Sequence, residues 1–173
     1  SRPGPALHTS TADLVNAFRF NVGTAFALSR IAAPRMVETA GGGSIINIAS
    51  IVGIAPEILN GVYGGTKAFV LAFSQSLHHE LTGKGIRIQA VVPGAIATEF
   101  WAVAGTPVEA LPSQIVMQPE DLVDAALAGF DQGELFTIPS LPELADWQAY
   151  EAARQKLMPN LSRQSVAQRY RRG

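Results

Sequence analysis

The stretch SIINIAS at residues 44–50 decides the fold, because it is short, rich in β-branched residues and apolar on both faces. That pattern is typical of a strand buried inside a parallel sheet. A second stretch of the same kind, IRIQAVV, occupies residues 86–92 and ends at Pro93-Gly94. Between them the apolar spacing predicts a helix over residues 62–81, which Gly83 and Gly85 would end. A strand–helix–strand order of this kind predicts two parallel strands joined by a right-handed crossover.

The same organisation extends in both directions. A helix is expected from a cap at Ser10 or Thr11 to about residue 39, continuing past Pro34 and ended by the glycines at 41–43. Helices over residues 119–130 and 143–157 flank a third strand at residues 135–139. The sequence therefore predicts a single α/β domain, residues 1–173, with a parallel Rossmann-like sheet and flanking helices.

Two segments lack a regular pattern. Residues 95–118 contain Gly105, Pro107 and Pro112, and the aromatic pair Phe100 and Trp101 suggests a loop that covers an apolar substrate. Residues 159–173 are arginine-rich, and we interpret them as a solvated tail.

Composition sets broad limits on function. Of the 173 residues 47% are hydrophobic and 16% are charged, the balance of a folded domain with a well-filled core. A net charge of -1 argues against nucleic acid or anionic lipid as a partner. The chain has no cysteine, which excludes disulfides and a thiolate metal site and fits a cytoplasmic location. No apolar run reaches the ~20 residues of a membrane span.

Tyr63 and Lys67 are four residues apart on the predicted 62–81 helix, so both side chains can share one face. A reductase needs a proton donor beside the carbonyl that receives hydride, but a free tyrosine has a pKa of about 10. A nearby ammonium favours the phenolate and would lower that pKa. Taken alone, the pair is more often a solvated helix face.

Ser50 ends the first strand thirteen positions before Tyr63, where its hydroxyl could hold a substrate oxygen. The alternative is a serine that simply ends a strand. Asn21 lies in mid-helix, a position that its side chain disfavours. It either bonds to a nearby backbone group or marks a kink that holds a water of a proton relay.

Further candidates follow the second strand. Gly94 would allow a ligand to approach the backbone closely, and Thr98 could bond a cofactor amide, although a turn with a threonine cap would look the same. The cluster His78-His79-Glu80 does not predict a metal site, because adjacent helical residues do not face each other. The glycines at 41–43 precede a strand, whereas a dinucleotide loop follows one, so we interpret them as a turn.

Together these residues resemble the short-chain dehydrogenase/reductase family. The matching stretches are NVGTAF around Asn21, GGSIINIASIVG around Ser50, VYGGTKAF around Tyr63 and Lys67, and IRIQAVVPGAIATEF with Pro93, Gly94 and Thr98. They come in the family's order and spacing. The resemblance is close over residues 10 to about 100.

The resemblance implies a role for each residue. Tyr63 would be the general acid/base, Lys67 would lower its pKa and bond the nicotinamide ribose, Ser50 would orient the carbonyl, and Asn21 would complete a proton relay. Ile96 and Thr98 would lie by the nicotinamide carboxamide, Ile96 through its backbone, and Pro93 and Gly94 would also bind the cofactor. Helices that carry Asn21 and Tyr63 pack between subunits in many members, so we expect a homodimer or homotetramer.

The family also implies features that these 173 residues lack. Its Gly-rich pyrophosphate turn, the residue that selects NAD or NADP, and an Asn-Asn-Ala-Gly stretch are absent, so we expect the last three strands of a doubly wound sheet and a fragment of a longer protein. The implied function is NAD(P)-dependent interconversion of an alcohol and a ketone or aldehyde, with NADP slightly preferred. The alternative is an inactive truncated relative that serves as an interaction or dimerisation module.

Overall fold

A computed structural model of the chain describes residues 6–59 and 61–171. The chain divides into two units, Ser1–Ser140 and Leu141–Gly173. The first unit contains both sheets and every candidate site residue. The second contains helix α6 (Leu144–Leu157), in which no residue is buried, followed by 3₁₀ turns at Met158–Asn160 and Gln168–Tyr170.

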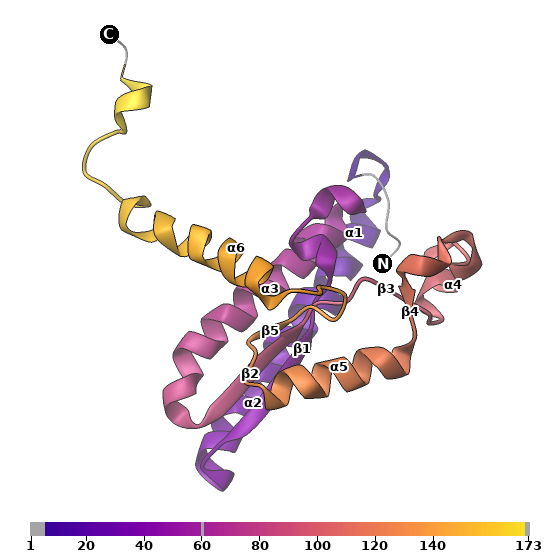
Figure 1. Cartoon of the computed structure of the whole chain (residues 1–173), viewed down its shortest axis with the longest axis horizontal. Coiled ribbons are helices and arrows are strands. Elements are labelled where there is room, and N and C mark those ends of the chain that lie inside the picture. The colour runs from indigo at the N-terminus through magenta and orange to yellow at the C-terminus, as the bar shows by residue number, and fades with distance from the viewer. Residues whose placement is uncertain (1–5, 60, 172–173) are drawn as a thin grey trace. The chain divides into compact units, whose positions relative to one another are not determined.

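The main sheet is parallel and has the strand order β1-β2-β5 (Figure 1). Strand β1 (Gly43–Ile48) pairs with β2 (Ile86–Val91), with Gly43 opposite Ile86 and Ile48 opposite Val91. Strand β5 (Phe136–Thr137) is shorter than the predicted 135–139 and pairs with the end of β2. The predicted Rossmann-like class, with three parallel strands in the main sheet, is confirmed.

The helix that precedes β1 is not uniform. It consists of α1 (Thr11–Ala17), a π-helical segment (Phe18–Gly23) and α2 (Thr24–Ala40). The Ser10 hydroxyl caps its start by accepting a hydrogen bond from the Asp13 N–H, and Gly41 ends it in the left-handed conformation at φ 65°. Pro34 lies inside α2 without ending it.

Helices cover the two faces of β2 differently. On one face Ile86 and Ile88 are buried against Ala33 of α2 and Leu77 and Leu81 of α3 (Val62–Leu81). On the other face the Gln89 amide donates to the Ala126 carbonyl of α5 (Pro119–Asp131) at 2.7 Å. Because neighbouring strand residues point to opposite faces, α2 and α3 lie on one side of the sheet and α5 on the other (Figure 1).

One face of β1 is open, as expected where only the last three strands of a doubly wound sheet are present, although the residue pattern alone indicates burial on both faces. Ile46 is 41% exposed and Ile48 is 54% exposed, whereas Asn47 on the other face is buried. No strand in the described part of the chain pairs with the outer edge of β1. The described residues do not cover this apolar face.

The segment after β2 is more ordered than the predicted irregular loop over residues 95–118. Strand β3 (Ala95–Ile96) pairs in parallel with β4 (Val116–Met117), and helix α4 (Phe100–Ala104) lies between them. Two-residue strands have no periodicity to detect, which explains why the sequence did not indicate them.

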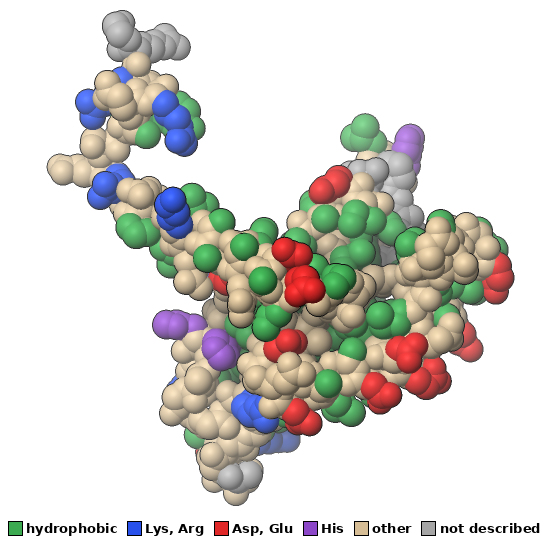
Figure 2. Space-filling view, viewed as in Figure 1, with side chains coloured by type: hydrophobic (Ala, Val, Ile, Leu, Met, Phe, Trp, Pro, Cys, Tyr) green, Lys and Arg blue, Asp and Glu red, His purple; other side chains and the backbone are tan. Residues whose placement is uncertain are grey.

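Surface chemistry adds two observations. Acidic side chains gather along α5 on the face shown in Figure 2, and α5 contains Glu120, Asp121 and Asp124. Within the described residues, no helix combines the length and the apolar character that crossing a bilayer requires.

The open edge of β1 leads to a first prediction. The 173-residue chain expressed by itself should self-associate or precipitate, because an exposed apolar strand with an unpaired edge recruits another chain. Ile48→Lys should give a smaller species in analytical ultracentrifugation, since a charge on an edge strand opposes pairing. The control is Ile58→Lys, a change of an equally exposed isoleucine outside the sheet. A wild-type chain that sediments as a monomer would contradict the prediction.

Candidate active site

Tyr63 and Lys67 share one face of α3, as their spacing predicts. The Lys67 Nζ lies 5.7 Å from the centroid of the Tyr63 ring. The same Nζ donates a hydrogen bond to the Ile48 carbonyl at 2.9 Å, and Ile48 is the last residue of β1. The lysine therefore ties the tyrosine-bearing helix to the carboxyl end of the first strand, the edge at which open α/β sheets bind ligands.

Two glycines allow the chain after β1 to lie directly on α3. A Cβ on Gly53 would come within 2.8 Å of the Lys67 carbonyl carbon, and a Cβ on Gly64 within 3.0 Å of the Val52 oxygen. A side chain at Gly53 would require the backbone to move, and one at Gly64 would make an unusually tight contact. This close approach places the 3₁₀ turn Ile51–Gly53, and Ser50 before it, beside the Tyr63–Lys67 pair.

Ser50 follows β1 and is 9% exposed. Its hydroxyl donates to the Pro93 carbonyl at 3.4 Å and accepts a hydrogen bond from the Val52 N–H at 3.5 Å. Both contacts are long, so the hydroxyl is weakly held. Ser50 thus joins the ends of β1 and β2, and Pro93 and Gly94, the predicted cofactor contacts, lie at the same sheet edge.

Asn21 lies in the π-helical segment, so the predicted kink exists as a change of helix type. Its amide donates to the Thr66 hydroxyl at 2.9 Å, and that hydroxyl donates to the Tyr63 carbonyl at 2.8 Å. The amide is therefore bound by a side chain, not by backbone. The sequence analysis missed Thr66, although its position three residues after Tyr63 places it on a neighbouring face of the same helix.

The electrostatic environment differs from the expectation for an activated tyrosine. Burial raises the pKa of the Tyr63 hydroxyl above its ordinary value of 10.0. Burial also lowers the pKa of the Lys67 ammonium. The expected lowering of the tyrosine pKa is not found in this structure, because loss of hydration acts on both groups and the ammonium is bound to the Ile48 carbonyl.

The segment after β2 adds aromatic residues and a cavity. The ring centroids of Phe100 and Tyr63 are 6.0 Å apart, and the Trp101 indole N–H donates to the Ile96 carbonyl at 2.8 Å. Thr98 borders a cavity of about 500 Å³ that is lined mainly by residues 102–109. A second cavity, of about 510 Å³ between α2 and α3, contains none of the predicted site residues.

The structure thus gathers the predicted residues at the carboxyl edge of the sheet. Tyr63 and Lys67 are in contact, Ser50 contacts Pro93, and Asn21 reaches Tyr63 through Thr66. Ile96 is connected to Tyr63 through the pair Trp101 and Phe100, and the Thr98 carbonyl accepts a hydrogen bond from the Trp101 N–H at 3.4 Å. The catalytic and cofactor-binding roles of these residues remain predictions.

The chain is a parallel α/β domain with Ser50, Tyr63 and Lys67 at the edge where such sheets bind ligands, and comparison with known proteins identifies the family. The profile of the short chain dehydrogenase family matches residues 1–107, and the chain belongs to this family. An uncharacterized oxidoreductase of Mycobacterium tuberculosis is 38% identical over 132 residues, which are 72% of this chain and 50% of that protein.

Solved structures agree with this assignment. A short-chain dehydrogenase from Sphingobium yanoikuyae in complex with NADPH superposes with a TM-score of 0.92 at 44% identity, covering 99% of this chain and 66% of that one. A bulky-bulky ketone specific alcohol dehydrogenase from Comamonas testosteroni gives a TM-score of 0.84 at 40% identity, covering 96% and 62%. The chain therefore spans less than two thirds of these relatives, and about half of the mycobacterial protein.

Gly53→Ala tests the close approach of the 51–53 turn to α3. The new methyl would press on the Lys67 backbone, so we expect a loss of about 1–3 kcal/mol in the free energy of unfolding. Gly65→Ala is the matched control, because a Cβ there meets nothing within 4 Å. An alanine in this helix should stabilise by roughly 0.5–1 kcal/mol. Urea denaturation of the two variants measures the difference, and equal effects would contradict the packing.

Alkaline titration tests the environment of Tyr63. The difference in phenolate absorbance between the wild type and Tyr63→Phe isolates this residue, and its midpoint should lie above 10.0. The folded state then holds the Tyr63 proton more tightly than the unfolded state. Its stabilising effect is complete below pH 10.0 and is lost as the pH rises through the folded pKa, so Tyr63→Phe should reduce the alkaline loss of stability. A midpoint below 10.0 would show that the Lys67 charge outweighs burial.

Proposed function

We propose that this chain is the catalytic part of an NAD(P)-dependent oxidoreductase that interconverts an alcohol and a ketone or aldehyde, with Tyr63 as the general acid/base. The observation that carries the proposal is the contact of Lys67 with both the Tyr63 ring and the carboxyl end of β1, where Ser50 follows. This arrangement puts a proton donor, a cation and a hydroxyl at one sheet edge.

The residues present suit a nicotinamide dinucleotide. An ammonium has three hydrogens, and Lys67 uses one for the Ile48 carbonyl, which leaves donors for ribose hydroxyls. Pro93, Gly94, Ile96 and Thr98 follow β2 at the same edge and would line the nicotinamide. The Sphingobium relative was solved with NADPH, which supports NADP slightly over NAD. When bound, the nicotinamide supplies or accepts the hydride.

Each side chain then has a defined task. Tyr63 donates its proton to the carbonyl oxygen during reduction and removes it from the alcohol during oxidation. In the described part of the chain its hydroxyl has no hydrogen-bond partner, and burial keeps it protonated. Ser50 turns its weakly held hydroxyl from Pro93 to the substrate oxygen. Asn21 and Thr66 hold the Tyr63 backbone and connect the site to the π-helical segment.

A homo-oligomer and a small-molecule partner remain part of this proposal, as expected from the family. The second candidate, an inactive interaction module, gains support only from the open face of β1. It gives no reason for a Tyr63, Lys67 and Ser50 group to be assembled at the ligand edge. Catalysis therefore accounts for more of the structure.

The test restores the features that the 173 residues lack. The dinucleotide-binding segment of the Sphingobium relative is fused ahead of Ser1, and oxidation of NADPH with a ketone is measured. We expect turnover, and Tyr63→Phe should lower kcat by about 10²–10⁴-fold while circular dichroism stays unchanged, since phenyl keeps the packing and loses the proton. Tyr170→Phe, a change of an exposed tyrosine in the second unit, is the control. Near-normal turnover by Tyr63→Phe would refute the mechanism, and a folded, NADPH-binding fusion without turnover would favour the inactive module.

A further inference from the structure

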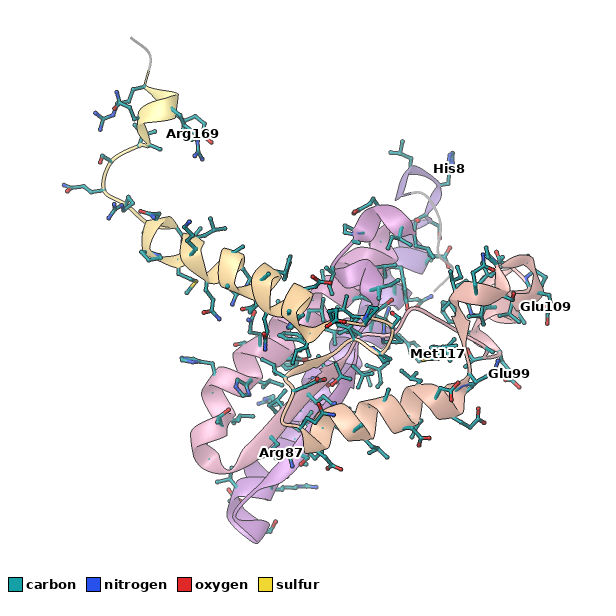
Figure 3. All side chains as sticks on the ribbon, viewed as in Figure 1. His8, Arg87, Glu99, Glu109, Met117 and Arg169 are labelled. Atoms are coloured by element: carbon teal, nitrogen blue, oxygen red, sulfur yellow. The ribbon has the colours of Figure 1, made fainter. Side chains whose placement is uncertain are left out.

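The C-terminal unit carries a concentration of positive charge. Between residues 154 and 172 the sequence has no acidic side chain, and its basic side chains are Arg154, Lys156, Arg163, Arg169, Arg171 and Arg172. Figure 2 shows lysine and arginine side chains along this unit, and Figure 3 labels Arg169 on its last turn. Arg154 pairs with Glu151, but Lys156 and Arg163 have no salt bridge among the described residues. Much of this charge is therefore available to an external partner.

The same unit has apolar surface that its own residues do not bury. Helix α6 has 14 residues, none of them buried, and a helix of this length is marginally stable without packing. We call residues 144–171 the arm. Its exposed apolar side chains include Leu157, Met158, Leu161, Val166 and Tyr170. Apolar side chains interspersed with arginines are typical of a surface that binds another protein.

Helix α5 presents a face of the opposite charge. Its exposed residues at helical spacing are Glu120, Val123, Asp124, Leu127 and Asp131. They share one side of the helix, while Gly129 on the other side is buried and packs against Thr137 of β5. From residue 88 to residue 153 the sequence has no lysine, arginine or histidine. Arg87 reaches α5 at its carboxyl end, where it donates to the Phe130 carbonyl. The rest of this acidic face combines carboxylates with apolar side chains.

The arm and the acidic face match in the sign of their charge and in their apolar content. Each is exposed in the single chain, since Leu161 is 69% and Leu127 is 52% exposed. Anionic lipid is a poorer match for the arm, because Asp146 and Glu151 on α6 carry the same charge as such lipid. A second copy of the chain supplies both complements at once. Because each copy carries both surfaces, a two-fold dimer makes the contact twice.

We propose that the arm of one copy binds the acidic face of α5 on a second copy, in a reciprocal exchange of arms. Carboxylates of α5 then meet arginines of the partner's arm, and Val123 and Leu127 receive its apolar side chains. This interface is separate from the contact expected through the helices that carry Asn21 and Tyr63. It does not rest on the proposed function, since none of its residues belongs to the candidate active site.

Cross-linking between single cysteines tests the exchange. The chain has no cysteine, so each introduced thiol is unique. A Leu127→Cys chain is mixed with a Leu161→Cys chain and treated with a bifunctional maleimide, and the peptide that joins residues 127 and 161 is measured by mass spectrometry. Both chains carry Ile48→Lys, so that the edge of β1 does not join the copies. This peptide can form only between copies.

The control replaces Leu127→Cys with Ile58→Cys, because Ile58 is 57% exposed and lies outside α5. We expect the yield with Leu127→Cys to be roughly tenfold higher than with the control. It should fall in about 0.5 M NaCl, since salt screens exposed charges.

Charge reversal identifies the pairing. Glu120→Lys with Asp124→Lys in the first chain, or Arg163→Glu with Arg169→Glu in the second, should each lower the yield roughly fivefold. Both reversals together should restore it, which a general loss of folding would not do. If the chain precipitates, the same variants of the fused protein, with any cysteine of the fused segment replaced by serine, give the same comparison.

Three outcomes would overturn the inference. The first is a yield no higher than that of the Ile58→Cys control, and the second is a failure of the combined reversals to restore the yield. The third is a cross-link that forms within a chain carrying both Leu127→Cys and Leu161→Cys but not between mixed copies, which would show that the arm binds its own α5. Sedimentation with phosphatidylglycerol vesicles in place of the cross-link would identify the arm as a lipid-binding segment and would overturn the inference as well.

Discussion

The whole site depends on how closely the chain after β1 can approach α3. Gly53 leaves no space for a Cβ and Gly64 leaves very little, so the 51–53 turn lies directly on the helix backbone. The Lys67 ammonium then reaches the Ile48 carbonyl at 2.9 Å. Because the last residue of the strand and the middle of the helix are bound to each other, the positions of Ser50 and Tyr63 follow from backbone packing and do not require a direct bond between their side chains.

A second attachment comes from the opposite side of α3. The π-helical segment turns Asn21 toward Thr66, and Thr66 holds the Tyr63 carbonyl. A π segment costs regular hydrogen bonding and is often found at functional sites. Here the π-helical segment places Asn21 where its side chain bonds directly to Thr66 of α3, close to Tyr63. Asn21, a residue type that disfavours a regular helix, thus has a structural role. Any water relay that used Asn21 would have to include an amide that is already hydrogen-bonded to Thr66.

Much of the fold and of the candidate site could be predicted from local patterns in the sequence. Helix α3 begins and ends at the predicted residues, Val62 and Leu81, because strong periodicity is bounded by glycines. The chemistry-bearing residues follow strands, and parallel topology brings strand ends together. Thr66 was missed because its role depends on a neighbour 45 residues away in sequence. The SIINIAS pattern alone indicates a strand buried on both faces, whereas the open face of β1 agrees with the expectation that only the last three strands of a doubly wound sheet are present.

The direction in which the pKa of Tyr63 shifts could not be predicted from the sequence either. The spacing indicates that a lysine is near, but not how much hydration the two groups lose on burial. Burial disfavours the phenolate of Tyr63 and the ammonium of Lys67 alike. The same low polarity strengthens the attraction between those two charges once both exist. Under the proposed function, loss of the Tyr63 proton would be unfavourable until an acceptor such as a developing alkoxide took it, and the resulting phenolate would then lie close to a cation that burial leaves poorly hydrated. A site with this balance would hold its proton in the resting state, as the proposed general acid requires.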